Sequence, residues 1–487
     1  MGAAGLLPLL PLLVLSGTAV GVLLGIALVR RHVLAAAGSA GGLALAFAVI
    51  PVASAFSPGR VTVLLLLDRF AYFYMGLVLA ASLAVSLLSY GYLEKRRGNR
   101  EEFYVLLLLA TLGAAVLTAG SHFASFFLGL ELLSVSLYAL IAYSRAGDSR
   151  PVEAGLKYLV LAGASSAFLL FGMALLYARF GEMEFARIGA SIAAAGEVRD
   201  PYLLAGTAMI LTGVGFKLAV VPFHMWTPDV YEGAPAPVSA FVATVSKGAV
   251  FALLLRYALV SGTTGSAPVA KVVGLIAVAS MLAGNLLALL QNNVKRILAY
   301  SSIAHMGYLL VAFLAGGPLA GEAATFYLVA YFVTTLGAFG VVAVCSGDDR
   351  DAETIADYRG MFWRRPWLAG AFTIALFSLA GIPLTAGFLG KFHVVAAGVR
   401  SEAIAPVLVL AAGSAMGLYY YLRIIVAMYA REPEGDGASS RPDGAPVSVP
   451  GGIVLAVLTL LLVVLGAFPS PWIRLIRAAV ASLLPGL

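Results

Sequence analysis

Apolar runs long enough to cross a bilayer follow one another along almost the whole chain. A helix needs ~20 mostly apolar residues to span the hydrocarbon layer of a membrane. Of the 487 residues, 61% are hydrophobic and only 11% are charged, against about 25% charged in ordinary soluble domains. A water-soluble globular fold is therefore excluded, and the sequence predicts an all-α polytopic membrane protein.

Charges, glycines and prolines divide the apolar sequence into about fourteen predicted transmembrane helices. Their approximate ranges are 8–29, 33–55, 70–92, 103–120, 122–143, 155–178, 203–226, 235–257, 271–290, 296–316, 323–346, 367–393, 404–429 and 451–469. The tail from Pro471 carries Arg474 and Arg477 and is predicted to form an interfacial helix. The longest loops, 347–365 and 431–450, are too short to fold as soluble domains.

Lysine and arginine are more frequent in alternate loops, which indicates an orientation. The richer loops lie at 30–31, 95–100, 145–150, 295–296, 350–365 and 431–441. Cytoplasmic loops carry the excess of basic residues, so these loops are predicted to face the cytoplasm. Both termini are then periplasmic, and Gly98 and Asp229 lie on the same, cytoplasmic side. The net charge of +7 thus reports orientation in a lipid bilayer rather than binding to nucleic acid.

The chain lacks the residues that would hold a redox centre or a nucleotide. Its single cysteine, Cys345, cannot form an internal disulfide, an iron–sulfur cluster or a zinc site, which need several ligands. Neither a dinucleotide-binding glycine pattern nor a P-loop is present. We therefore expect no cofactor and no metal in this chain. The energy for its function is expected to come from partner proteins or from an ion gradient.

Ionisable residues inside predicted spans are the main functional signal. Glu131, Lys217, Lys247 and Lys391 lie deep in their helices, where a charge costs at least about 2.5 kcal/mol on insertion scales. Desolvation disfavours the charged form of such groups, so that they can take up and release protons near neutral pH. We interpret these four residues as a proton relay, in which Glu131 and Lys217 form an ion pair whose making and breaking sets the proton affinity of the lysine.

Two further basic residues have simpler explanations. Lys157 follows Glu153 by one helical turn, so that a stabilising surface pair is as good an explanation as a place in the relay. Arg423 lies near the end of its helix, from which its side chain can reach the membrane surface.

His224 and His305 fall in or beside spans, and each fits a proton-relay role or a packing role equally well.

Helix-breaking residues accompany two of the lysines. Pro222 follows Lys217, and Gly381, Pro383 and Gly387 precede Lys391. Interrupted membrane helices are tolerated where the freed carbonyls are buried in protein or line a hydrated cavity. We therefore predict that the seventh and twelfth helices are broken.

The positions of the two breaks suggest an internal repeat. Helices four to eight (103–257) and nine to thirteen (271–429) form two five-helix units, each broken in its fourth helix, and the odd count forces opposite orientations. The first three helices (1–102) and a C-terminal part (430–487) flank these two units.

Several stretches resemble the antiporter-like subunits of respiratory complex I. They are GLELLSVSLYAL, GVGFKLAVVPFHMWTPDVYEGAPAPVSAF, NNVKRILAYSSIAHMGYLLVA and FSLAGIPLTAGFLGKF. The resemblance covers about residues 60–430, and FHMWTPDVYEGAPAPVSAF is most similar to the subunit N family of NADH:quinone oxidoreductase. It implies a proton-translocating subunit of a translocase in the bacterial inner membrane. NADH, FMN, iron–sulfur clusters and quinone would then belong to partner subunits.

The resemblance also implies roles for individual residues and partners. Glu131, Lys217, Lys247 and Lys391 match the family's glutamate and lysines, and Lys157 matches a further lysine often present in subunit N. The expected partners are a neighbouring antiporter-like subunit and small membrane subunits of complex I. The alternative function is that of a Mrp-type cation/proton antiporter or of an antiporter-like subunit of a membrane-bound hydrogenase, which share the fold and the charge pattern.

Overall fold

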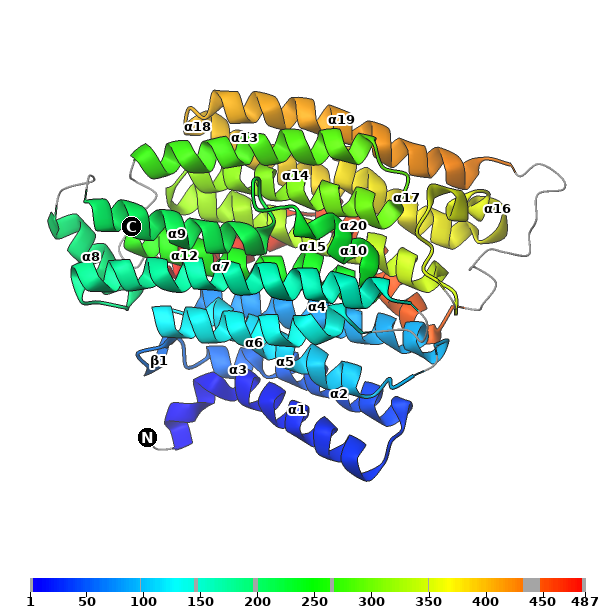
Figure 1. Cartoon of the computed structure of the whole chain (residues 1–487), viewed down its shortest axis with the longest axis horizontal. Coiled ribbons are helices and arrows are strands. Elements are labelled where there is room, and N and C mark those ends of the chain that lie inside the picture. Colours follow the sequence, from blue (N-terminus) through cyan, green and yellow to red (C-terminus); the bar gives the residue numbers. More distant parts are fainter. Residues whose placement is uncertain are drawn as a thin grey trace.

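The computed structural model describes residues 3–96, 98–143, 148–195, 200–262, 267–348, 350–431 and 447–483 as a bundle of long, nearly aligned helices (Figure 1). In these ranges, 13 helices are long and apolar enough to cross a membrane. Another crossing is made of two half-helices, α17 (Pro366–Ala380) and α18 (Ala386–Arg400). The predicted helical membrane fold is confirmed. Parts of two predicted basic loops, 144–147 and 432–446, lie outside the described residues.

The N-terminal region contains three crossings and a small hairpin. Its elements are η1 (Ala3–Leu9), α1 (Leu10–Leu28), α2 (His32–Ala48), α3 (Ile50–Ser54), β1 (Gly59–Thr62), β2 (Leu65–Leu67) and α4 (Arg69–Glu94). Strands β1 and β2 pair antiparallel.

The next part of the chain corresponds to the first predicted five-helix unit. It comprises α5 (Glu102–Ala119), α6 (Phe123–Ile141), α7 (Arg150–Phe180), the short α8 (Phe185–Ala195), α9 (Pro201–Leu218), α10 (Trp226–Gly233), α11 (Ala236–Phe241), the π-helical turn η2 (Val242–Ser246) and α12 (Lys247–Ser261). The last three elements form one continuous crossing, Ala236–Ser261.

The remainder corresponds to the second unit and the C-terminal part. It comprises α13 (Ala267–Leu289), α14 (Val294–Leu314), α15 (Gly317–Cys345), η4 (Ile355–Tyr358), α16 (Met361–Arg364), α17, α18, α19 (Ile404–Tyr429), α20 (Val449–Ala467) and α21 (Ser470–Ala481).

The core of the bundle is built from the crossings that lie between its two edges. In Figure 1, α1 and α2 form one edge and α13 and α19 the other, and both marked termini lie at the same end. The crossings Ala236–Ser261 and Gly317–Cys345 bury all of their most apolar window, whereas α1, α19 and α20 bury only about a third of theirs. Polar side chains on the central crossings are therefore shielded from lipid by other helices.

A buried charge cluster organises one end of the bundle, which we call the loop face. Asp351 is fully buried and accepts hydrogen bonds from Arg96 Nη2 at 2.7 Å and from Lys295 Nζ at 2.8 Å. Lys295 also donates to the carbonyls of Glu232 and Ala234 at the end of α10. The cluster places the segments around Gly98 and Asp229 at the same end, as predicted. Arg96 and Lys295, expected in open loops, are instead buried because Asp351 compensates their charge.

The segment that leads from α15 to α16 is fixed by a second acidic residue, Asp357. Its carboxylate accepts hydrogen bonds from Arg350 at 2.6 and 3.0 Å and from the Thr354 backbone N–H at 2.8 Å. Burial by itself would raise the pKa of Asp357, but these hydrogen bonds hold that pKa below its usual value.

At the opposite end, an ion pair joins three crossings. Arg256 lies in α12 and is only 1% exposed. Its guanidinium donates to both carboxylate oxygens of Asp68, at 2.7 and 2.8 Å, and to the Thr118 carbonyl at 3.3 Å. Asp68 also caps α4 by accepting from the Ala71 N–H. The charge is tolerated inside because its partner is bidentate and equally buried.

The C-terminal helix α21 packs across this same end. Ile476 and Val480 contact Phe326 of α15, and Arg477 pairs with Glu322 at 3.1 Å. The short, half-exposed helix has the character expected of an interfacial segment.

We expect Asp68→Asn to destabilise the protein, because it leaves the Arg256 guanidinium buried without a counter-charge, a loss of about 3–5 kcal/mol. The measurement is the thermal unfolding midpoint of the purified complex in detergent. Arg477→Gln is the control, since its ion pair is exposed, and it should change the midpoint little. Equal midpoints for Asp68→Asn and the parent would contradict the role assigned to this pair.

Cysteine labelling tests the orientation of the bundle. The native Cys345 is buried and should not react. A cysteine at the exposed Asn99 of the loop face should be labelled from the cytoplasmic side, and one at the exposed Arg187 of α8 from the other side. Labelling of both variants from a single side would refute the predicted topology.

Candidate functional site

The seventh crossing breaks after α9. Ala219 ends this helix in the left-handed conformation, with φ of 59°, and Pro222 has no N–H to continue the helix. The groups freed by the break find other partners: Trp226 Nε1 donates to the Phe216 carbonyl at 3.0 Å, and the Val221 N–H donates to Ser280 Oγ at 2.9 Å. The predicted break is thus present. Its backbone is buried against other parts of the protein, which is the condition under which non-helical backbone is tolerated inside a membrane.

The twelfth crossing breaks between α17 and α18. Gly381 ends α17 with φ of 84°, a backbone conformation that favours glycine. Gly387 lies so close to α17 that a Cβ atom there would be 1.8 Å from the Ser378 carbonyl oxygen. Its N–H donates to Ser378 Oγ at 3.0 Å. The glycines of the predicted break therefore allow the two half-helices to meet.

Lys217 lies in the last turn of α9, directly before the first break. The side chain is buried, and Nζ donates to Ser134 Oγ of α6 at 2.7 Å and to Tyr158 OH of α7 at 3.3 Å. The negative end of the helix dipole favours a cation at this position.

Lys391 occupies the equivalent electrostatic position at the second break. From α18 its ammonium donates to the carbonyls of Leu379 and Ala380, both at 2.9 Å, at the C-terminal end of α17. It also donates to Ser414 Oγ of α19 at 2.5 Å and lies 5.2 Å from the centre of the Tyr308 ring. These carbonyls have no partner within their own helix, so the lysine stabilises the broken end.

Lys247 lies between the two breaks, in the crossing Ala236–Ser261, and is fully buried. It follows the π-helical turn Val242–Ser246, a distortion that is frequent at functional sites. Its Nζ atom donates to Ser302 Oγ of α14 at 2.7 Å, and Ser302 shares a hydrogen bond of 2.7 Å with Tyr331 OH. The Tyr231 ring lies 5.5 Å from Nζ.

His305 lies between the Lys247 and Lys391 clusters. Its Nδ1 atom is 2.7 Å from Tyr327 OH. Its ring centre lies 5.4 Å from that of Tyr331, which shares Ser302 with Lys247, and 5.3 Å from that of Tyr308, which faces Lys391. The structure thus brings Lys247, His305 and Lys391 into one buried row, with hydroxyl groups and aromatic rings between them.

Glu131 does not form the ion pair that the sequence suggested. Its carboxylate accepts a hydrogen bond from Ser166 Oγ at 2.6 Å, whereas Lys217 turns to Ser134 and Tyr158. Glu131 and Ser134 are three residues apart on α6, so that they lie on the same side of the helix. Ser134, rather than Glu131, is the direct partner of Lys217. In this structure a neutral hydroxyl rather than the Glu131 carboxylate binds Lys217, and the making and breaking of the Glu131–Lys217 pair stays a prediction.

Lys157 and His224 lie apart from this row. Lys157 is 43% exposed and pairs with Glu153 and Asp229, both at 2.8 Å, toward the loop face. His224 lies in the segment of the first break, largely buried, and among the described residues its Nδ1 atom has no hydrogen-bond partner.

Comparison with known proteins shows the family. Residues 120–417 match the family described as NADH:quinone oxidoreductase/Mrp antiporter, TM. The NADH-quinone oxidoreductase subunit N of Ectopseudomonas mendocina is 50% identical over 98% of this chain and 97% of its own length. That of Nitrosospira multiformis is 52% identical over 90% of this chain and 89% of its own. The chain belongs to the subunit N family.

Solved structures agree with this membership. A chain in the structure of respiratory complex I from Thermus thermophilus with bound aureothin is 33% identical, with a TM-score of 0.81, and the match covers 96% of this chain and 99% of that chain. A chain of the Mrp complex from Dietzia sp. has a TM-score of 0.87 at 21% identity, covering 100% and 98% of the two chains, which shows a shared fold.

The polar partners of the lysines are what sequence reasoning missed in this subunit N family member. They are mostly hydroxyl groups on other helices. Ser134, Tyr158, Ser302 and Ser414 accept hydrogen bonds from the lysines, while Tyr331 bonds to Ser302 and Tyr327 to His305. One signal was present: Ser302, His305 and Tyr308 recur at every third residue of SSIAHMGY and so share one helix face.

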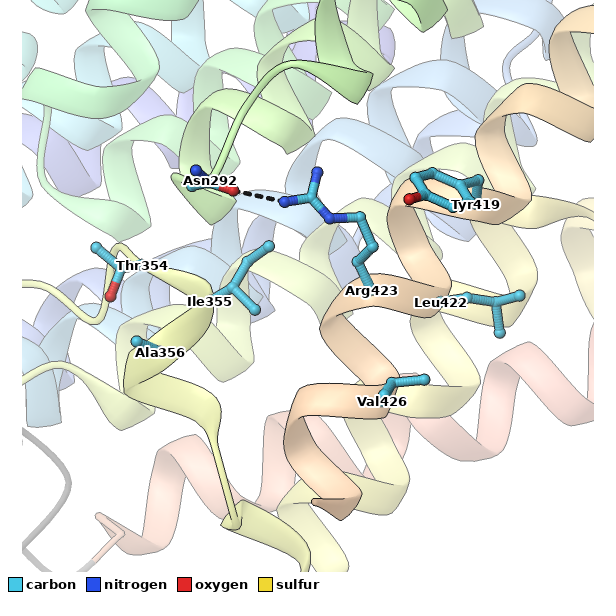
Figure 2. A pocket seen from close by; sticks show the side chains of 8 residues that line it. All are labelled: Asn292, Thr354, Ile355, Ala356, Tyr419, Leu422, Arg423 and Val426. Atoms are coloured by element: carbon cyan, nitrogen blue, oxygen red, sulfur yellow. Dashed lines mark hydrogen bonds between the residues drawn. The ribbon is translucent and has the colours of Figure 1, made fainter. Parts of the chain in front are cut away.

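A pocket of about 630 Å³ opens beside α19 at the loop face, away from the row of lysines. Figure 2 shows Arg423 on α19 with its guanidinium turned toward Asn292. Arg423 also donates to the carbonyls of Leu289 and Gln291 at the end of α13. Arg423 thus has a structural role, as a cap for the end of α13, whereas the sequence suggested a side chain that reaches the membrane surface.

In the described part of the chain, no group of three or more His, Cys, Asp or Glu side chains is arranged to hold a metal ion. The chemistry available in the buried row is that of groups able to exchange protons: ammonium, imidazole and hydroxyl.

We expect Gly387→Ala to separate the two half-helices, because its Cβ atom would overlap the Ser378 carbonyl. Overpacking of this kind costs about 1–3 kcal/mol and should lower the amount of assembled subunit and its thermal midpoint. Gly370→Ala in α17 is the matched control, because its Cβ atom meets nothing within 4 Å. Similar behaviour of the two variants would show that close approach at the break is unimportant.

Proposed function

We propose that this chain is a proton-translocating membrane subunit of an NADH:quinone oxidoreductase, and that Lys217, Lys247, His305 and Lys391 carry the protons. The observation that supports it most directly is the burial of three lysines at or between two helix breaks, each bonded to hydroxyl groups rather than to a carboxylate. A lysine paired with a carboxylate is held in its charged form, whereas one bonded to hydroxyls can lose its proton with less cost.

The geometry supports a sequence of short transfers in the second half of the chain. Ser302 accepts from Lys247 and contacts Tyr331, whose ring lies next to that of His305. Hydroxyl and imidazole groups both donate and accept hydrogen bonds, so that they can pass a proton between the two lysines. Lys391 is then the terminal donor, and the orphan carbonyls of α17 bind its charged form.

Glu131 has an indirect role in this proposal. Its carboxylate and the Ser134 hydroxyl lie one turn apart on α6, so its charge acts on Lys217 through space. Lys157 and His224 lie outside the row, and we do not place them among the groups that carry protons.

The energy for transport comes from partners in this proposal. Electron transfer from NADH through FMN and iron–sulfur clusters to quinone takes place in other subunits, and a neighbouring antiporter-like subunit and small membrane subunits contact this chain in the inner membrane. Both termini are periplasmic.

We further propose that the five-helix units 103–257 and 271–429 are inverted repeats. In each unit the third crossing is long, 31 residues in α7 and 29 in α15, and the fourth crossing is broken. Each break also places a lysine ammonium near the C-terminal end of a half-helix. This correspondence favours a transport path that passes from one unit to the other.

A second candidate function is cation/proton antiport of the Mrp type, which the likeness to the Mrp complex favours at the level of fold. The two candidate functions differ in whether proton transport depends on another cation such as sodium. Vesicles that contain the whole complex should pump protons during NADH oxidation without sodium if the first function is right.

Substitution of Lys391 tests the relay. Lys391→Met cannot carry a proton, and Lys391→Arg keeps a charge that is almost never lost, because guanidinium has a pKa above ~12. Both variants should reduce proton uptake per NADH oxidised in vesicles with normally assembled complex. If Lys391→Arg pumps as well as the parent, Lys391 is a fixed charge and the relay is wrong.

A further inference from the structure

A chain of charges at the loop face joins three helices outside the buried row. Asp229 of α10 accepts a hydrogen bond from Lys157 of α7 at 2.8 Å and another from Arg296 of α14 at 3.0 Å. Each of its two carboxylate oxygens serves one partner. We call these three residues the Asp229 bridge.

Each helix of the bridge also carries a partner of a central lysine. On α7, Tyr158 is adjacent to Lys157 and accepts from Lys217. On α10, Tyr231 follows Asp229 by two residues, and its ring lies 5.5 Å from Lys247 Nζ. On α14, Ser302 follows Arg296 by six residues and accepts from Lys247. The bridge thus connects the surroundings of Lys217 to those of Lys247.

The position of α10 depends strongly on such contacts. It has only eight residues and is separated from α9 by the break at Ala219–Met225. Helical hydrogen bonds therefore do not continue from α9 into α10, and isolated helices of this length are not stable on their own. Lys295 holds the C-terminal end of α10 through the carbonyls of Glu232 and Ala234. Arg296 also pairs with the Glu232 carboxylate at 2.7 Å, so that α10 stays joined to α14 without Asp229. Asp229 is the carboxylate through which α10 binds Lys157 of α7, which also pairs with Glu153 of its own helix at 2.8 Å.

We propose that Asp229 is a positioning residue. It couples α7 to the half-helix α10, which Arg296 joins to α14 through both Asp229 and Glu232, so that the hydrogen-bond partners of Lys217 and Lys247 move together. This inference rests on the proposed function. When the bridge is intact, a shift of α10 changes the distance between Tyr231 and Lys247. The same shift moves α7, which carries Tyr158, because Asp229 binds Lys157 of that helix. Proton release from one lysine is thereby linked to proton uptake by the next.

The bridge is poorly suited to a purely stabilising role. Its side chains are partly exposed, 43% for Lys157, 38% for Asp229 and 24% for Arg296. Exposed ion pairs contribute little to stability. Loss of the Asp229 charge should therefore leave folding and assembly intact and should alter proton transfer.

The experiment compares Asp229→Asn, Lys157→Gln and the double variant in vesicles that contain the whole complex. Asparagine keeps the size of Asp229 and removes its charge. We expect Asp229→Asn to lower proton uptake per NADH oxidised by at least about twofold and to shift the pH profile of pumping. Asp229→Glu should restore most of the activity. The double variant should be no worse than the more impaired single variant, because both substitutions break the same contact.

Arg477→Gln is the control. It removes an ion pair of similar length, 3.1 Å to Glu322, whose side chains are likewise partly exposed and which lies at the opposite end of the bundle. It should pump like the parent.

Lys217→Ala separates this inference from the proposed function. If Lys217→Ala pumps normally, the relay itself is wrong. If Lys217→Ala is impaired while Asp229→Asn pumps with the parent's ratio and pH profile, only the positioning role is overturned. Failure of Asp229→Asn to assemble would also overturn it, because Asp229 would then be a structural residue.

Discussion

The central lysine sites depend on one constraint, the free-energy cost of holding a charged amine inside a membrane. The structure meets this cost at Lys217 and Lys391 by ending a helix where the amine lies. A helix that stops inside the bilayer exposes carbonyls and the negative end of its dipole, and both favour a cation. Lys391 binds two such carbonyls directly, and Lys217 lies in the last turn of its half-helix. The breaks are therefore part of the lysine sites.

The charges that hold the bundle together are treated differently. Arg256 and Lys295 are as buried as the central lysines, but each faces a buried carboxylate at 2.7 or 2.8 Å. Such pairs keep their charges fixed, which suits an anchor between crossings. The central lysines face hydroxyl groups instead, an environment that suits the uptake and release of protons. Among the described residues, the choice of partner rather than the depth of burial distinguishes the two groups.

The sequence was a good guide to the helices and a partial guide to the site. Deep lysines, Pro222 and the glycines before Lys391 were visible because each contradicts the local rule for a membrane helix. The contact of Lys217 with Ser134 rather than with Glu131 was not visible in the sequence, since opposite charges in separate helices do not reveal which hydroxyl lies between them. Lys295 and Arg256 show the same difficulty: their positions along the chain do not reveal that Asp351 and Asp68 are their partners.

The sequence by itself determined the number and character of the crossings, the two breaks and the identity of the buried lysines, because hydropathy and helix breaking are local properties. Tertiary structure alone decided which side chains surround each lysine. Ser134 meets Lys217 across 83 positions of sequence, and Asp68 meets Arg256 across 188. Contacts over such separations depend on how helices pack and at what rotation, and local sequence patterns do not contain that information. The Asp229 bridge is the clearest case, since its three residues lie on three different helices.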